Sequence, residues 1–104
     1  MSEAGREIVH VVIRGRVQGV GYRAFVEDEA VRLGIEGWVR NRRDGKSVEA
    51  VFAGSDHAIR AIVELCRKGP MGARIDDVAQ RKGTPGELAQ RGHARESKPL
   101  KSGA

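Results

Sequence analysis

One glycine-rich loop constrains the fold of this chain more than any other feature, because a strand pattern ends at it and a helix pattern begins after it. Residues 8–14 read IVHVVIR, a β-branched run that predicts a strand. Residues 15–21 read GRVQGVG and include three glycines. From Tyr22 to Leu33 the apolar residues recur at helical spacing, so an amphipathic helix is predicted directly after the loop.

The pattern continues with three more strands and a second helix. Residues 35–42 and 47–54 flank a polar turn with an Asp-Gly pair and predict a hairpin. Ser55 can cap a second helix, a Gly-Pro pair ends it, and residues 73–78 follow as a short strand. The order β-α-β-β-α-β predicts an α+β fold of ferredoxin-like type, with an antiparallel sheet and two helices on one face.

The last part of the chain breaks this pattern. Residues 81–104 hold six Lys and Arg residues and two Glu, with Leu88 and Leu100 as their only large apolar residues. We therefore expect one domain over residues 1–80 and a basic, mobile tail over residues 81–104. If this tail holds no fifth strand, the second strand is left as an open edge of the sheet.

Composition and termini narrow the class of protein. A chain of 104 residues with 39% hydrophobic residues suits one core, and no apolar run approaches the roughly 20 residues that a membrane span needs. The N-terminus lacks the pattern of a signal peptide, and Cys66 is the only cysteine, so we expect a cytoplasmic protein. The three histidines have no Cys or carboxylate partner at metal-ligand spacing. We expect no metal and no other cofactor.

The loop at 15–21 has the composition of an anion-binding site. Glycines allow several backbone N–H groups to turn inward, and the start of a helix adds further N–H groups without a partner. Arg23 lies in the first turn of the predicted helix, where its planar guanidinium can bind two oxygens of a phosphate. The loop has neither a Walker lysine nor the GxGxxG spacing. Spacing alone therefore leaves open a plain glycine-rich turn beside a solvated arginine.

Two separated motifs resemble those of a known family. The stretch IRGRVQGVGYR at 13–23 closely resembles the first signature of the acylphosphatases, and GWVRN at 37–41, followed by DG, a valine and Gly54, resembles their second. KGPMGARI at 68–75 is similar to the segment after their second helix, so the likeness covers about residues 8–78. The resemblance implies a small α/β sandwich of ferredoxin-like topology that hydrolyses the carboxyl–phosphate anhydride of acyl phosphates without a metal.

The resemblance also implies roles for individual residues. Arg23 matches the family's phosphate-binding arginine, and Asn41 matches the asparagine that orients the attacking water. No side-chain base is evident beside Asn41, so an oxygen of the substrate's own phosphate would take the proton. Val17 and Val20 are expected to anchor the loop to the core. The expected phosphate-binding loop consists of Gly15, Arg16, Val17, Gln18, Gly19, Val20, Gly21 and Tyr22.

We therefore expect a monomeric enzyme that acts on small acyl phosphates and is inhibited competitively by its product, inorganic phosphate. A non-catalytic phosphate-binding module of the same fold is one alternative. A basic nucleic-acid-binding domain is another, because the net charge is +5 and sheets of this type often bind RNA through exposed aromatic residues. The open face of this sheet would carry a single aromatic residue, Trp38, which argues against that alternative.

Overall fold

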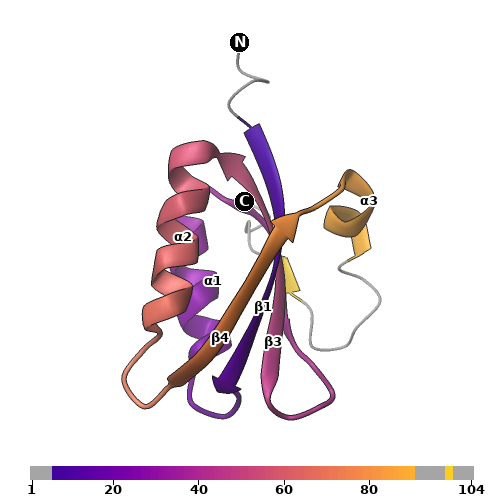
Figure 1. Cartoon of the computed structure of the whole chain (residues 1–104). Coiled ribbons are helices and arrows are strands. Elements are labelled where there is room, and N and C mark those ends of the chain that lie inside the picture. Colours follow the sequence, from indigo (N-terminus) through magenta and orange to yellow (C-terminus); the bar gives the residue numbers. More distant parts are fainter. Residues whose placement is uncertain (1–5, 91–97, 100–104) are drawn as a thin grey trace.

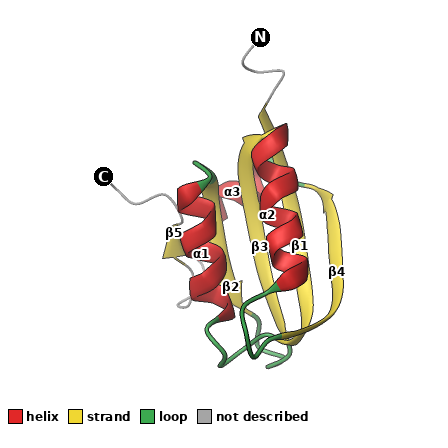
Figure 2. Ribbon diagram, turned by 90° about the vertical axis from the view of Figure 1, so that its left-hand side faces the viewer, coloured by secondary structure: helices red, strands yellow, loops and turns green. Residues whose placement is uncertain are grey.

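In the part of the chain that the structure describes, five strands form one antiparallel sheet, and two helices cover one of its faces (Figures 1 and 2). The computed structural model describes residues 6–90 and 98–99. The order of strands across the sheet is β4-β1-β3-β2-β5, and the order of the first six elements along the chain confirms the ferredoxin-like prediction. The strands are β1 (Arg6–Arg16), β2 (Glu36–Asn41), β3 (Ser47–Ser55), β4 (Arg74–Lys82) and β5 (Lys98–Pro99), and the helices are α1 (Tyr22–Arg32), α2 (Asp56–Lys68) and α3 (Pro85–Leu88).

The core lies between the sheet and the two long helices. Strand β1 pairs with β3 on one side and with β4 on the other, so its backbone is hydrogen-bonded along both edges. Alternation along a strand sends every second side chain to the same face, which buries Val9, Val11 and Ile13 under the helices. Strand β3 contributes Val48, Ala50 and Phe52 to the same layer.

The two long helices begin in different ways. Ser55 precedes α2, and its Oγ accepts a hydrogen bond from the backbone N–H of Ala58 at 3.1 Å, as the cap rule predicts. Gly21 precedes α1 with φ of 78°, a left-handed conformation that suits glycine. No helix in the described ranges is both long and apolar enough to span a bilayer.

A buried hydrogen bond joins the start of α1 to α2. The hydroxyl of Tyr22 donates to the backbone carbonyl of Cys66 at 2.8 Å, and both residues are at most 1% exposed. Burial raises the pKa of the Cys66 thiol to about 12 and raises the pKa of the Tyr22 hydroxyl as well. Cys66 is therefore a small buried residue of the core.

The opposite face of the sheet is partly covered by α3, an element that the sequence pattern after residue 80 does not predict. Strand β4 continues to Lys82, and α3 follows with a capping box between Thr84 and Glu87. The indole N–H of Trp38 donates to the carbonyl of Glu87 at 2.9 Å, and Trp38 is only 2% exposed. In Figure 1, α3 lies on the side of the sheet away from α1 and α2.

The edge of β2 that would be open without a fifth strand is paired with β5. Trp38 and Val39 pair in antiparallel fashion with Pro99 and Lys98 of β5. The expectation of a free edge is therefore wrong at these two positions, since a short strand far along the chain returns to β2. Residues 91–97 and 100–104 lie outside the described residues, so the division of the chain at residue 80 stays a prediction.

Charged side chains form a network on the face that α3 partly covers. The Nε2 atom of His10 lies 2.7 Å from Oε2 of Glu49, and the Nε and Nη2 atoms of Arg40 donate to Oε1 of the same carboxylate at 2.9 and 2.7 Å. Arg40 also lies over the ring of Trp38, 5.3 Å from its centroid. Although burial raises the pKa of the Glu49 carboxyl, its hydrogen bonds with His10 and Arg40 hold it below its usual value of 4.5.

This network predicts a loss of stability in acid. A carboxyl whose pKa is lower in the folded state stabilises the fold above its unfolded pKa, and this contribution is lost as pH falls through the folded pKa. Glu49→Gln should lower the free energy of unfolding at pH 7 by about 1–3 kcal/mol. The stability of this variant should then fall less than that of the wild type below pH 4.5.

Urea unfolding at a series of pH values tests this expectation. Glu36→Gln is the matched control, because Glu36 is more exposed and pairs with Arg6 at 3.3 Å, where β1 and β2 begin. Its unfolding free energy should stay within about 0.5 kcal/mol of the wild type. Parallel pH curves for the wild type and Glu49→Gln would contradict the role given to this carboxylate.

Candidate active site

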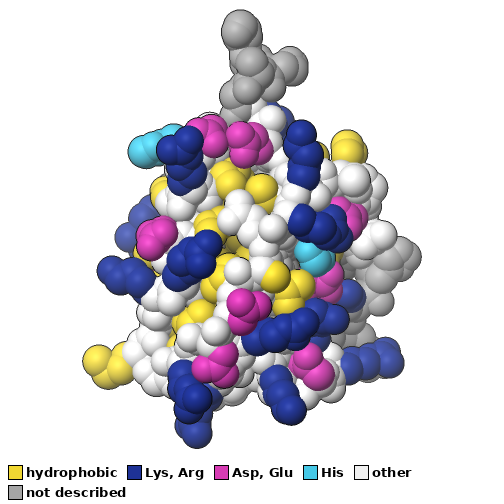
Figure 3. Space-filling model, viewed as in Figure 1, with side chains coloured by type: hydrophobic (Ala, Val, Ile, Leu, Met, Phe, Trp, Pro, Cys, Tyr) yellow, Lys and Arg dark blue, Asp and Glu magenta, His cyan; other side chains and the backbone are white. Residues whose placement is uncertain are grey.

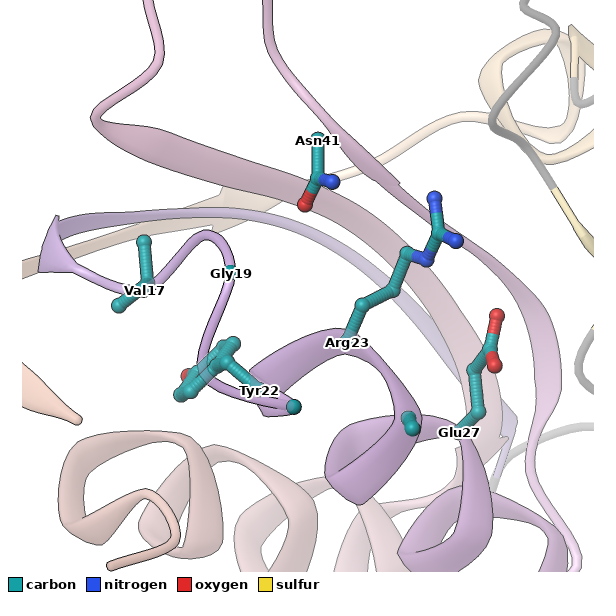
Figure 4. A pocket seen from close by; sticks show the side chains of 8 residues that line it. Val17, Gly19, Tyr22, Arg23, Glu27 and Asn41 are labelled. Carbon is teal, nitrogen blue, oxygen red and sulfur yellow. The ribbon is translucent and has the colours of Figure 1, made fainter. Parts of the chain in front are cut away.

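A cavity of about 210 Å³ lies where the glycine-rich loop meets the start of α1 and the end of β2. Figure 4 shows the side chains around it. Arg23 of α1 and Asn41 at the end of β2 both line it, although they are 18 positions apart in the sequence. The lining residues are Val17, Gly19, Gly21, Tyr22, Arg23, Ala24, Glu27 and Asn41.

The sheet register places Asn41 beside the loop. Asn41 pairs with Val48 of β3, and Val48 pairs with Ile13 of β1, so the three residues form one row across the sheet. The loop begins just beyond Ile13, at the end of β1. Side chains in one row point to the same face, and Ile13 faces the helices. Asn41 therefore leaves the sheet on the helix side, next to the loop.

The backbone of the loop turns through three glycines with positive φ. Gly15 has φ of 139°, and a Cβ there would clash with the carbonyl oxygen of Arg74 on the neighbouring strand. Gly19 and Gly21 have φ of 76° and 78°, in the left-handed region that few other residues adopt. Gly21 has no side chain to cap α1, so the first N–H groups of this helix have no partner within it. They lie at the cavity wall formed by Gly21, Tyr22 and Arg23.

Arg23 and Asn41 extend from opposite walls of the cavity. In Figure 4 the side chain of Arg23 rises from the helix toward β2, and the amide of Asn41 points back toward the loop. The guanidinium of Arg23 lies in this view between the amide of Asn41 and the carboxylate of Glu27. Two hydrogen-bonding groups and a helix N-terminus thus face one small space, an arrangement that can hold a phosphate and a water molecule together.

The loop is fastened to the turn between β2 and β3. The side-chain Nε2 of Gln18 donates to the carbonyl oxygens of Arg42 and Ser47, both at 2.8 Å. The backbone N–H of Gly15 donates to the carbonyl of Lys46 at 3.0 Å. Valine side chains hold the loop from the other side: Val17 is 1% exposed, and Val20 is partly buried against the core, as the sequence predicts.

Comparison with known protein families decides where this chain belongs. The acylphosphatase family model matches residues 9–90, which include the loop, both cavity walls and α3. The chain belongs to the acylphosphatase family. An acylphosphatase of Bradyrhizobium diazoefficiens is 57% identical over 83 residues, which cover 80% of this chain and 83% of that protein.

Solved acylphosphatase structures have the same fold. The acylphosphatase from Coxiella burnetii superimposes with a TM-score of 0.75 at 32% identity, over 79% of this chain and 85% of that one. The Bacillus subtilis acylphosphatase gives a TM-score of 0.68 at 35% identity, over 77% and 90% of the two chains. These similarities confirm the family that the two sequence motifs indicate.

The acylphosphatase motifs do not all reach the cavity. Among the residues predicted for the phosphate-binding loop, Val17, Gly19, Gly21 and Tyr22 line it. The others hold the loop in place or lie outside the cavity, namely Gly15, Arg16, Gln18 and Val20.

One charged residue at the acylphosphatase cavity is not predicted by the sequence motifs. Glu27 lines it together with Arg23. The two residues are four positions apart on α1, a spacing that places side chains on the same face of a helix, and this spacing is the signal that could have found Glu27. Within residues 6–90 and 98–99, no group of three or more His, Cys, Asp or Glu side chains is placed to hold a metal ion.

Proposed function

We propose that this chain hydrolyses the carboxyl–phosphate anhydride of small acyl phosphates at the cavity between the loop and β2, without a metal. The observation that supports this most is the presence of Arg23, Asn41 and the helix N-terminus around one small space. Acylphosphatases act on small acyl phosphates, and this chain belongs to their family. A volume of about 210 Å³ is enough for a phosphate and a water molecule.

Phosphate binding is assigned to Arg23 and the loop backbone. A dianionic phosphate presents three oxygens, and a guanidinium can bind two of them at once. The N–H groups of the loop and of the first turn of α1 supply fixed partial positive charge on the other side. The transition state of phosphoryl transfer carries its charge on these oxygens. The same groups therefore stabilise the transition state as well as the bound substrate.

Water placement is assigned to Asn41. Its amide can hold a water molecule in line with the bond that breaks. The water oxygen forms a bond to phosphorus, and the bond between phosphorus and the carboxylate oxygen breaks. The acyl group leaves as a carboxylate with the bonding electron pair, while a water proton passes to a phosphate oxygen of the substrate. Because a carboxylate is a good leaving group, placement and charge stabilisation supply most of the catalysis.

The structure gives no support to nucleic-acid binding. Trp38 is the aromatic residue of the sheet face away from the long helices, and it is only 2% exposed because α3 lies against it. Base stacking needs an exposed ring. On the face shown in Figure 3, Lys and Arg side chains alternate with Asp and Glu instead of forming a continuous basic stripe.

The cellular setting is part of the same proposal. We expect a monomer in the cytoplasm that binds inorganic phosphate as product and competitive inhibitor. The single cysteine, Cys66, is buried and free, which is compatible with a reducing compartment. Pairing of β5 with β2 covers part of an edge that would otherwise invite association between copies.

Replacing Arg23 tests phosphate binding. Arg23→Ala should lower the turnover of an acyl phosphate on the order of 10³-fold or more, because an arginine that stabilises the transferring phosphoryl group contributes this much. Arg23→Lys should restore little, since one ammonium cannot copy the two-point contact. Initial-rate kinetics of phosphate release measures both variants. Near-normal turnover in Arg23→Ala would contradict the assignment.

Replacing Asn41 tests water placement separately from anion binding. Asn41→Ala should lower kcat by about 10²-fold or more. The inhibition constant for inorganic phosphate should stay within about threefold of the wild type, because the amide is assigned to the water and not to the anion. Equal losses in kcat and in phosphate affinity would instead make Asn41 a binding residue. Retained phosphate binding with no turnover in the wild type would favour the non-catalytic module.

A further inference from the structure

Gln18 lies in the middle of the proposed phosphate loop, yet its side chain is not among those that line the cavity. Its amide is directed at the hairpin between β2 and β3, where Nε2 donates to the carbonyl of Arg42 and to the carbonyl of Ser47, each at 2.8 Å. An amide nitrogen has two N–H groups, so both are used in this contact. Gln18 is partly buried there, which strengthens hydrogen bonds relative to those exposed to water.

The two carbonyl groups that accept from Gln18 lie close to Asn41, the residue assigned to water placement. Arg42 follows Asn41 directly in the chain, and Ser47 precedes Val48, the pairing partner of Asn41 across the ladder. The backbone N–H of Arg42 also donates to the carbonyl of Ser47 at 3.0 Å, which closes the turn. The amide of Gln18 thus contacts the residue that follows β2 and the first residue of β3, directly beside Asn41.

The hairpin turn is itself held firmly, so it can serve as a fixed anchor. The Oδ1 atom of Asp44 accepts hydrogen bonds from the backbone N–H groups of Lys46 and Ser47 at 2.8 and 3.0 Å. Its Oδ2 atom accepts from the hydroxyl of Ser47 at 2.7 Å, and Ser47 is fully buried. The hydrogen bond from the Ser47 hydroxyl is the main reason why the pKa of Asp44 lies below its usual value, and the hydrogen bond from the Lys46 backbone is the second.

We propose that Gln18 is a positioning residue that fixes the phosphate loop relative to Asn41, so that the bound phosphorus and the attacking water keep one geometry. This inference rests on the proposed hydrolysis of acyl phosphates. Arg23 and the loop place the phosphorus, while Asn41 places the water from another strand. In-line attack needs both placements to agree, and a displacement of about 1 Å can cost about 10²-fold in rate. The loop turns through Gly19 and Gly21, whose backbone freedom needs an outside restraint.

A double-mutant cycle tests this proposal. Gln18→Met keeps the length of the side chain and removes both donors. We expect kcat for acetyl phosphate to fall by about 10- to 100-fold, while the inhibition constant for inorganic phosphate stays within about threefold. In the Asn41→Ala background the same substitution should lower kcat by less than about twofold, because two residues that act through one geometry are not additive.

Ser55→Ala is the matched control for lost stability. Ser55 caps α2 and does not line the cavity. It lies at the far end of β3, so its substitution removes one hydrogen bond between a side chain and the backbone without changing the loop or the β2–β3 turn. Its kcat should equal that of the wild type. Urea unfolding of every variant shows whether it is folded under assay conditions. If Gln18→Met does not fold, Gln18→Asn, whose side chain is one methylene shorter and cannot reach both carbonyls, should give the same kinetic pattern.

The outcomes separate this inference from the proposed function. Equal losses from the Gln18 substitution in the wild-type and Asn41→Ala backgrounds would overturn the inference, and so would unchanged kcat in a folded variant. A rise in the phosphate inhibition constant that matches the fall in kcat would make Gln18 part of anion binding and would overturn it too. A wild-type chain that releases no phosphate would overturn the proposed function, and the inference with it.

Discussion

The pairing of β1 with both β3 and β4 is the constraint on which the rest of the structure depends. The pairing of β1 with β3 places Ile13 beside Val48. Val48 in turn pairs with Asn41 of β2, so the three residues lie in one row. A slip of one residue in this register would turn Asn41 to the other face of the sheet. The loop also starts from the end of β1, so the same strand determines where the N–H groups of the loop and the amide of Asn41 stand relative to each other.

The chemistry proposed for the cavity follows from this arrangement. An acyl phosphate needs little activation, because its carboxylate leaves readily, but it needs its charge and its attacking water held in place. A guanidinium, a helix N-terminus and an amide can provide this without a metal or a strong base. Arg23 comes from α1 and Asn41 from β2, and the Gln18 contact joins the loop to the hairpin that carries Asn41. The site is therefore shared between elements that the sheet holds together.

The sequence predicted those parts of the fold that depend on local pattern. Alternation in β1, helical spacing in α1 and the Ser55 cap are each encoded within a few neighbouring residues, so their elements were foreseen. The docking of α3 was missed because it uses no apolar stripe: Trp38 donates to a backbone carbonyl of Glu87. The capping-box pattern from Thr84 to Glu87 was a visible signal for this turn. The partners of Gln18 are backbone carbonyls 24 and 29 positions away. Local sequence patterns do not predict contacts over such separations.

Release of inorganic phosphate from acetyl phosphate in excess chelator, with p-nitrophenyl phosphate as a parallel substrate, tests the central claim most directly. The proposed site stabilises the phosphoryl charge and positions the water, but it contains no group assigned to activate a poor leaving group. It should therefore hydrolyse the anhydride at the same rate with and without chelator, and the ester far more slowly. Turnover that chelator abolishes and a divalent cation restores would contradict the account, as would the absence of any release from acetyl phosphate.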